Sequence, residues 1–280
     1  MSQPLLPLLV EPAELESKLG ASNLLRVDLN RADIYAHAHL PGARRLDYAD
    51  IVAAKPPAMG LVPDTKRLSE ILSRIGLTPS VHVVAYDAES GSRAARFLWT
   101  LDAIGHPHYS LLNGGLVAWQ QEGRVATNEP AAAPKPSQYT ATLRDNVIAD
   151  KDWILKHLKD PNVVILDARS AAEYDGSLLR AARGGHIPGA VNFDYMQAID
   201  AARQTRLRPA EELRRELISV GVTPEKEVVV YCQTHHRSAH TWFVLKSLGY
   251  PKLRGYPGSW SEWGNSPDTP IEQHRSSGPI

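Results

Sequence analysis

Short, continuously hydrophobic runs alternate along the chain with longer amphipathic stretches. Val163–Leu166 and Val228–Tyr231 are uniformly apolar and too short for helices, as is typical of strands that are covered on both faces. Arg208–Ile218 has an early proline, acidic residues in its first turn and apolar residues three or four positions apart, which predicts a helix. Strands that alternate with helices in this way predict an α/β fold, in which helices flank a parallel sheet.

The sequence also repeats itself once. His39–Ala43 reads H-L-P-G-A, and His186–Ala190 reads H-I-P-G-A. The apolar runs that end at Asp87 and Cys232 read V-V-A-Y-D and V-V-V-Y-C. The two members of each pair lie 147 and 145 positions apart (39 to 186 and 87 to 232). So constant an offset between ordered motifs indicates two copies of one module of about 120 residues.

The segment between the two copies has no periodicity. It contains the run N-E-P-A-A-A-P-K-P at 128–136, and its prolines and small residues predict a semi-extended linker. We therefore predict a first domain over 1–124, a linker over 125–148, a second domain over 149–270 and a tail over 271–280. The end of the chain is rich in proline, serine and glycine, which predicts a surface strap with a frayed terminus.

Composition narrows the class of protein. Of the 280 residues, 43% are hydrophobic and 22% are charged, which is typical of a soluble globular protein. The formal net charge is zero, so the totals point neither to nucleic acid nor to an anionic membrane as a partner. No export peptide and no membrane helix is evident. The single cysteine excludes an internal disulfide and fits a reducing compartment, so we expect a cytoplasmic monomer.

That single cysteine, Cys232, directly follows a predicted buried strand. A helix is predicted to begin at Ser238, so only the six residues from Cys232 to Arg237 join strand and helix. In so short a loop the amide N–H groups and the helix N-terminus converge on one point, which binds anions. Nearby N–H dipoles and the Arg237 cation favour the thiolate form of a cysteine. The loop therefore predicts a nucleophile that attacks anionic substrates, at the strand end where open α/β sheets bind ligands.

The loop also has other interpretations. A lone cysteine is often only a small buried hydrophobic residue. His235 and His236 resemble metal ligands, but two adjacent histidines and one cysteine have no recognised metal-site spacing, so we expect no metal. We instead predict that the two histidines add positive potential or a proton donor at the mouth of the loop. Arg237 is either a solvated charge or, as its place at the helix entry favours, an anion ligand.

Several motifs now resemble a known family. They are D-A-R-S-A-A-E-Y at 167–174, G-H-I-P-G-A at 185–190 and Y-P-G-S-W-S-E-W at 256–263, besides the double module and the strand–cysteine loop. Together they resemble the tandem-domain rhodaneses, which are thiosulfate sulfurtransferases. The resemblance implies two rhodanese-like domains, each a parallel sheet flanked by helices, with Cys232 as the catalytic cysteine. Asp87 stands at the cysteine position of the first copy, which implies that this copy is inactive.

The resemblance also implies a mechanism and a set of site residues. The Cys232 thiolate takes the outer sulfur of a small anionic donor such as thiosulfate, and the resulting persulfide passes it to cyanide, a thiol or a protein acceptor. The covalent persulfide makes a separate cofactor unnecessary. The implied substrate-binding residues are Gln233, Thr234, His235, His236, Arg237 and Arg169. Arg169 matches a substrate-binding arginine of the family, but an ion pair with Glu173 that braces the fold is an equal alternative.

The loop departs from both familiar versions of the family motif. C-Q-T-H-H-R is neither the C-R-K-G-V-T of thiosulfate enzymes nor the C-G-S-G-V-T of mercaptopyruvate enzymes, and it resembles a loop of a bacterial subgroup. Its positive charge favours thiosulfate as the donor over mercaptopyruvate. A sulfur carrier that delivers persulfide to a partner protein stays open as an alternative. A cysteine phosphatase is disfavoured because its arginine would fall at position 238, which is Ser238.

Overall fold

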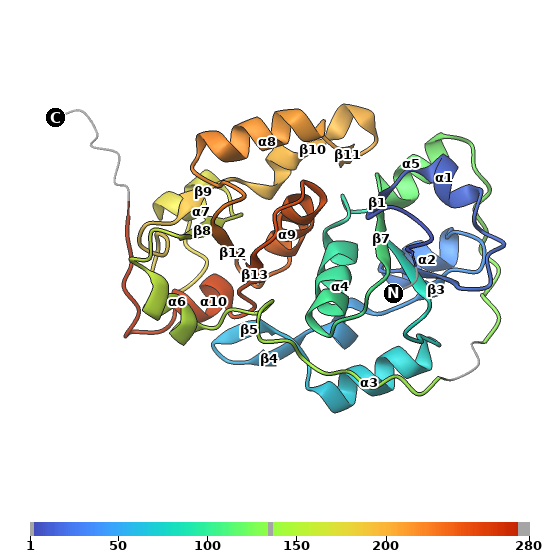
Figure 1. Ribbon diagram of the computed structural model, residues 1–280, viewed down its shortest axis with the longest axis horizontal. Helices are drawn as coiled ribbons and strands as arrows, with labels where there is room; N and C mark the ends of the chain where they lie inside the picture. The colour runs from blue at the N-terminus through green and yellow to red at the C-terminus, as the bar shows by residue number, and fades with distance from the viewer. Residues whose placement is uncertain (1–2, 134–136, 274–280) are drawn as a thin grey trace. The chain divides into compact units, whose positions relative to one another are not determined.

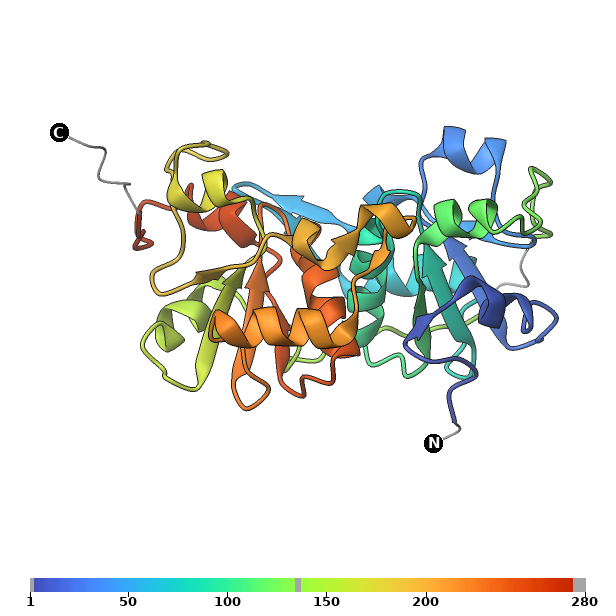
Figure 2. The ribbon, with the colours of Figure 1, turned by 90° about the horizontal axis from the view of Figure 1, so that it is seen from above.

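The structure is a computed structural model that describes residues 3–133 and 137–273. The chain forms two compact units (Figures 1 and 2). The first unit contains the residues up to Val52, Val62–Arg144 and the short segment Ile199–Leu207. The second unit contains Asp145–Ala198 and the residues from Arg208 onward, together with Ala53–Leu61. Each unit thus includes a short segment from the other half of the chain.

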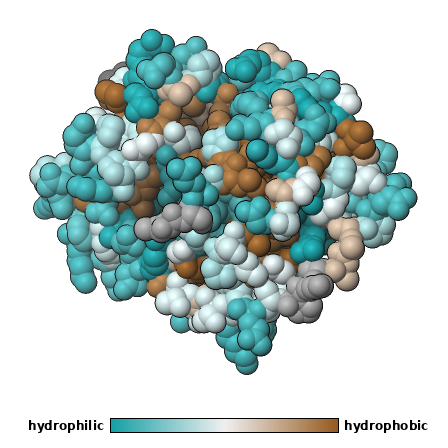
Figure 3. Space-filling model, turned by 45° about the vertical axis from the view of Figure 1, so that its right-hand side comes forward, coloured by the Kyte–Doolittle hydropathy of each residue, from teal (hydrophilic) through white to brown (hydrophobic). Residues whose placement is uncertain are grey.

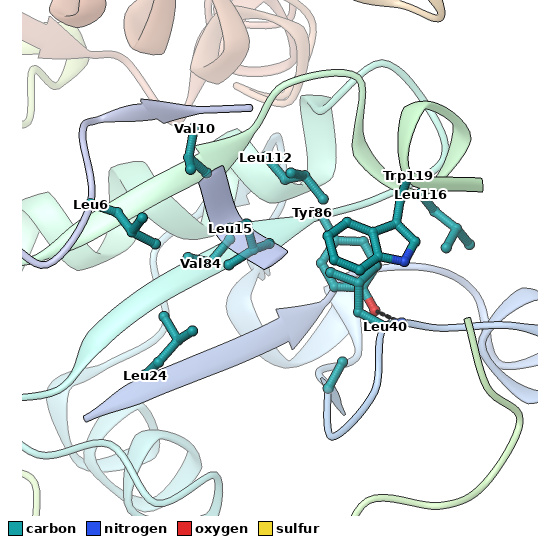
Figure 4. Packing of buried hydrophobic residues seen from close by; sticks show 11 residues of the cluster. Leu6, Val10, Leu15, Leu24, Leu40, Val84, Tyr86, Leu112, Leu116 and Trp119 are labelled. Carbon is teal, nitrogen blue, oxygen red and sulfur yellow. Dashed lines mark hydrogen bonds between the residues drawn. The ribbon is translucent and has the colours of Figure 1, made fainter. Parts of the chain in front are cut away.

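The first unit is built on a parallel sheet with the strand order β1-β7-β6-β2-β3. Its strands are β1 (Leu9–Val10), β2 (Leu24–Asp28), β3 (Arg44–Arg45), β6 (His82–Tyr86) and β7 (Tyr109–Leu112). Its helices are α1 (Pro12–Glu16), α2 (Ala32–His37), η1 (Tyr48–Ile51), α3 (Thr65–Arg74), α4 (Ser92–Ala103) and α5 (Gly115–Gln121). Figure 4 shows one face of this sheet, where Val84 and Tyr86 of β6 pack beneath Leu112 and Trp119.

The second unit is built on a parallel sheet with the strand order β13-β12-β8-β9. Its strands are β8 (Val163–Asp167), β9 (Val191–Asn192), β12 (Glu227–Tyr231) and β13 (Leu253–Gly255). Its helices are α6 (Lys151–His157), α7 (Ala171–Asp175), η2 (Tyr195–Ala198), α8 (Ala210–Ser219), α9 (Arg237–Ser247) and α10 (Ser259–Trp263). The predicted α/β fold with two parallel sheets flanked by helices is therefore confirmed.

Strand β12 shows why these residues form a buried strand. Val229 and Tyr231 point to a core that also holds Trp260 and Trp263 of α10. The alternate residues Val228 and Val230 are equally buried, because side chains of a strand alternate between its faces and α9 packs against β12. A strand covered on both faces has no polar side, which explains its uniformly apolar sequence.

The internal repeat extends to single hydrogen bonds. In the first unit the Tyr86 hydroxyl at the end of β6 accepts a hydrogen bond from the amide of Leu40 in the H-L-P-G-A motif, at 3.0 Å (dashed line in Figure 4). In the second unit the Tyr231 hydroxyl accepts one from the amide of Ile187 in H-I-P-G-A, at 3.2 Å. Each tyrosine therefore ties its strand end to the loop that carries the repeated motif.

The two exchanged segments also correspond to each other. Ala53–Leu61, called here the first hairpin, consists of the antiparallel strands β4 (Ala53–Lys55) and β5 (Ala58–Leu61). Ile199–Leu207, the second hairpin, consists of β10 (Ile199–Asp200) and β11 (Arg206–Leu207), with the short helix η3 (Ala201–Arg203) between them. The second hairpin begins 146 positions after the first, which matches the offset of the sequence repeat. The division predicted from sequence was contiguous and did not anticipate this exchange.

The described parts of the linker and the tail follow the surface of their units. The linker amides of Tyr139 and Ala141 donate to the hydroxyls of Ser73 and Ser69. The tail pairs with the motif loop through Glu272 and His186. Residues 134–136 of the predicted linker and 274–280 of the predicted tail lie outside the described residues.

Hydrophilic residues cover most of the face shown in Figure 3. Within the described ranges, no helix has both the length and the apolar character of a membrane span.

Candidate active site

Cys232 directly follows the carboxyl end of β12, which is an inner strand of the second sheet. Strand β12 ends at Tyr231 and α9 begins at Arg237, so the loop predicted from sequence joins them. The cysteine is 1% exposed, and it is the free thiol of the chain. The first turn of α9 presents amide groups that have no acceptor within the helix, at the end where the helix dipole is positive. Cys232 therefore lies between a strand end and a helix N-terminus, where open α/β sheets bind ligands.

The residues after Cys232 are held in a defined loop conformation. His235 adopts a left-handed backbone with φ of 54°, which costs a residue other than glycine about 1 kcal/mol. Its ring is buried, and Nδ1 lies 2.8 Å from the Ser238 hydroxyl in the first turn of α9. The Gln233 amide group donates to the Arg180 carbonyl oxygen at 2.9 Å. These contacts favour a structural role for His235 and Gln233, whereas Thr234 and His236 are partly exposed at the loop.

Arg237 forms a two-pronged ion pair with Glu173. Its Nη1 and Nη2 atoms lie 2.6 Å and 2.8 Å from the two carboxylate oxygens. Glu173 also closes a capping box with Ser170 at the start of α7, which fixes its side chain. Burial lowers the pKa of Arg237, but the Glu173 carboxylate and the nearby Cys232 sulfur outweigh it and raise the pKa overall. Arg237 therefore stays charged close to the cysteine, and its fork keeps further N–H groups for a bound anion.

Arg169 is enclosed beneath the active-site loop. Its Nη2 atom donates to Asp167 at 2.6 Å and to the Gly185 carbonyl oxygen at 2.7 Å, and the side chain is 1% exposed. The guanidinium carbon lies 4.4 Å from the centre of the Trp260 ring, which is cation–π geometry. The ion pair between Arg169 and Glu173, an alternative that the sequence left open, is wrong, because Arg169 pairs with Asp167 and Glu173 pairs with Arg237. Such enclosure favours a bracing role for Arg169.

The first turn of α10 holds the backbone on both sides of Cys232, a role that the sequence did not reveal. The Ser259 hydroxyl accepts from the Cys232 amide at 3.3 Å. The amides of Trp260 and Ser261 donate to the carbonyl oxygens of Cys232 and Gln233, both at 2.9 Å. Ser259 itself has a left-handed φ of 51°. Ser259 and Ser261 are buried and lie inside the motif Y-P-G-S-W-S-E-W, but nothing in that motif distinguishes them from serines on the surface.

The first unit shows what a loop of this kind does with a negative charge. Asp87 is 1% exposed, and its Oδ1 accepts from the amides of Glu89 at 2.7 Å and Gly91 at 2.8 Å. Its Oδ2 accepts from the Ala94 amide at 2.9 Å. Burial raises the pKa of Asp87, and these three N–H groups act in the opposite direction. The loop thus cradles its own carboxylate, at the position that Cys232 occupies in the second unit.

We expect Asp87→Ala to destabilise the protein without impairing sulfur transfer. Three buried amide groups lose their acceptor, and the free energy of unfolding falls by about 1–3 kcal/mol. The rate of transfer per folded molecule should stay within about twofold, because Cys232, the predicted nucleophile, belongs to the other unit. Urea unfolding and a cyanide-coupled assay measure the two effects. Loss of transfer in the folded variant would contradict an inactive first loop.

The ion pair of Glu173 with Arg237 should make the protein less stable in acid. Burial alone would raise its pKa, but the hydrogen bonds and charge of Arg237 lower it from 4.5 to about 2. A carboxyl whose pKa is lower in the folded state stabilises the protein above its unfolded pKa, and this contribution disappears as the pH falls from 4.5 through about 2. In Glu173→Gln we therefore expect a flatter dependence of the unfolding free energy on pH over this interval. An unchanged slope would show that the ion pair adds no stability.

Among the residues that the structure describes, there is no group of three or more histidine, cysteine, aspartate or glutamate side chains that could hold a metal ion.

The fold and this site define the class of protein. The family model described as "Rhodanese-like domain" matches residues 11–122 and 150–266, and the chain belongs to this family. A thiosulfate sulfurtransferase of Azotobacter vinelandii is 46% identical over 267 residues, which cover 95% of this chain and 97% of the relative. A thiosulfate sulfurtransferase of Pseudomonas aeruginosa is 44% identical with the same coverage.

Some of the more distant matches have other names. A protein of Thermus thermophilus named a sulfur carrier protein is 36% identical over 85% of this chain and 86% of the relative. Among solved structures, an anaerobic ergothioneine biosynthesis enzyme from Chlorobium limicola superposes with a TM-score of 0.84 at 22% identity, over 95% of this chain and 70% of that one. At that identity the likeness shows the fold alone.

Proposed function

We propose that the protein is a thiosulfate sulfurtransferase that works through a persulfide on Cys232. The observation that carries the proposal is the position of the thiol, which lies at the end of β12 and the start of α9, with Arg237 close by. Two relatives named for this activity, with 44% and 46% identity over almost the whole chain, support the same conclusion. We place Cys232 as the nucleophile and Arg237 as the charged ligand of the donor.

The reaction is a double displacement through a covalent intermediate. In the first step the Cys232 thiolate attacks the outer sulfur of thiosulfate and forms a new S–S bond. The original S–S bond breaks, and sulfite leaves with the bonding electron pair. In the second step cyanide attacks the outer sulfur of the persulfide, thiocyanate leaves, and the thiolate is restored. Charge is conserved in both steps, and neither an oxidant nor a cofactor is consumed.

The protein's contribution is electrostatic. The persulfide and the departing sulfite both carry negative charge, and fixed N–H dipoles around the reacting sulfur stabilise such charge without reorganising. The Asp87 carboxylate in the first unit supports this role, because a loop of equal length there and the first turn of α4 together place three amides around an anion. The charge-neutral pair of Arg237 and Glu173 keeps the arginine in place. Gln233, Thr234, His235 and His236 shape the loop around the donor.

A sulfur carrier that hands the persulfide to a protein acceptor is the second candidate function. It is supported by the relative from Thermus thermophilus that is named a sulfur carrier protein. A carrier would show one round of transfer with small acceptors, whereas an enzyme turns over many times. In either case we propose a monomer that acts on small anionic donors, and a cytoplasmic location, which the single cysteine fits.

Steady-state kinetics with thiosulfate and cyanide test the proposed mechanism. Because the donor product leaves before the acceptor binds, double-reciprocal plots at several cyanide concentrations should be parallel. Mercaptopyruvate in place of thiosulfate should support a slower reaction, since it lacks the sulfonate that Arg237 would bind. Intersecting lines would instead indicate that donor and acceptor bind together, and would contradict the persulfide route.

A further inference from the structure

The first hairpin lies directly against the active-site loop. It comes from the first sequence repeat, yet it belongs to the second unit. A Cβ atom built on Gly60 would lie 2.1 Å from the Thr234 carbonyl oxygen and 2.7 Å from the Pro257 carbonyl oxygen. Thr234 is two residues from Cys232, and Pro257 begins the segment that includes Ser259. At Gly60 the hairpin backbone therefore touches both segments that surround the thiol.

A hydrogen-bonded connection fixes the hairpin in this place. The Met59 amide donates to the Ser261 hydroxyl at 3.1 Å, and this hydroxyl donates to the Gly258 carbonyl oxygen at 2.8 Å. The Ser261 amide in turn donates to the Gln233 carbonyl oxygen at 2.9 Å. Ser261 thus joins the hairpin to the loop that follows Cys232, through partners that are all within the second unit.

Position 60 requires glycine because there is no space for a side chain. Gly60 lies in strand β5 and is not among the residues with a positive φ. Any residue can adopt this backbone conformation, so only the approach of the two carbonyl groups excludes a side chain. A contact under 3.0 Å with backbone atoms cannot be relieved by rotating a side chain, so the hairpin or the active-site loop would have to move.

The second hairpin is held differently in the first unit. Arg206 lies 146 positions after Gly60, at the equivalent place. Its side chain forms ion pairs with Glu11, at 3.1 Å, and with Glu122. The Leu207 amide donates to the Asn113 side chain at 2.9 Å. A Cβ atom built on Gly114 would also lie 2.7 Å from the Gln204 carbonyl oxygen of this hairpin. Both hairpins thus approach their units closely through the backbone, and the long Arg206 side chain adds ion pairs that Gly60 does not provide.

We propose that Gly60 is a positioning residue for sulfur transfer, which rests on the proposed function above. The C=O of Thr234 faces Gly60, and in a planar trans peptide the N–H of the next residue points the opposite way. Contact with the hairpin therefore fixes the plane of the Thr234–His235 peptide in the active-site loop and directs the His235 N–H away from the hairpin. The first repeat, which lacks a catalytic cysteine, contributes to the reaction through this hairpin.

Gly60→Ala tests the proposal, with Gly20→Ala as the matched control. Gly20 is exposed, has no atom within 4 Å of a built Cβ and is not left-handed, so the same added methyl group has room there. We expect Gly60→Ala to lower kcat and the rate of persulfide formation by about tenfold or more, since misplaced catalytic groups carry penalties of this size. Gly20→Ala should stay within about twofold of the wild type.

Stability is measured on the same samples to separate positioning from folding. If Gly60→Ala lowers the melting temperature but keeps the wild-type kcat and persulfide rate well below that temperature, the contact is structural only and the proposal is overturned. Ser261→Ala provides a second variant, because it removes the acceptor of the Met59 amide while adding no atoms. Ser261→Ala should also slow persulfide formation. If Gly60→Ala does not fold, a wild-type rate of persulfide formation in Ser261→Ala overturns the proposal.

The wild type separates this proposal from the function on which it rests. A wild-type protein that gains no sulfur from thiosulfate removes the proposed function, and the role of Gly60 falls with it. A wild-type protein that gains sulfur, beside a folded Gly60→Ala protein that gains it equally fast, leaves the sulfurtransferase intact and overturns only the role of Gly60.

Discussion

Cys232→Ala should abolish sulfur transfer while the protein stays folded. Without the thiol no persulfide forms, and loss of a covalent nucleophile lowers kcat by about a thousandfold or more. The substitution removes one buried sulfur atom from a site otherwise held by backbone hydrogen bonds, so the loop keeps its anchors at Ser259, Trp260 and Ser261. The cyanide-coupled assay measures the activity, and thermal unfolding confirms that the variant is folded.

Cys232→Ser is the matched variant for this test. It keeps a group of similar size with a hydroxyl in place of the thiol, and a hydroxyl cannot accept the sulfane sulfur under these conditions. Both variants should therefore be inactive and folded. Residual activity above about a tenth of the wild type in either variant would sink the assignment of Cys232 as the nucleophile.

Arg237→Ala should raise the KM for thiosulfate by about 10- to 100-fold. A hydrogen bond to a charged group contributes about 1.5–3 kcal/mol, which corresponds to a factor of this size. The KM for cyanide should change much less, because the acceptor attacks after sulfite has left. The same variant leaves the buried Glu173 carboxylate without its partner, so we also expect a lower melting temperature.

The double variant Glu173→Gln/Arg237→Ala separates these two effects. Neutral glutamine removes the uncompensated charge and should restore much of the stability, but not the affinity for thiosulfate. Glu173→Gln alone keeps the cation and should keep a KM close to that of the wild type. If the KM for thiosulfate does not move in Arg237→Ala, this arginine is not a ligand of the donor, and its ion pair serves only the fold.

The fold could be predicted from the sequence because its signals are local. Strand β12 extends only one residue beyond the predicted Val228–Tyr231, and α9 begins one residue before the predicted Ser238. A strand that is buried on both faces has a uniformly apolar sequence, and a helix with one exposed face has apolar residues three or four positions apart. Each element can therefore be recognised from its own stretch of sequence. The internal repeat indicated that there are two sheets, and the position of Cys232 at the end of a predicted strand indicated where the site lies.

The side-chain partners at the site could not be predicted in the same way. Arg237 and Glu173 are 64 positions apart, and their ion pair depends on how α7 packs near the start of α9. Arg169 was assigned to the substrate by family pattern, but only the packing of Trp260 and Asp167 around it reveals its enclosure. The exchange of the two hairpins leaves no local signal, since a strand pairs within its hairpin whichever unit it joins.

The mass of the intact protein tests the central claim most directly. The reduced protein is measured alone, after incubation with thiosulfate, and again after addition of cyanide. We predict a gain of the mass of one sulfur atom with thiosulfate, its loss with cyanide, and no gain at all in Cys232→Ala. A reduced wild-type protein that gains no sulfur from thiosulfate would contradict the persulfide on Cys232, and with it the proposed function.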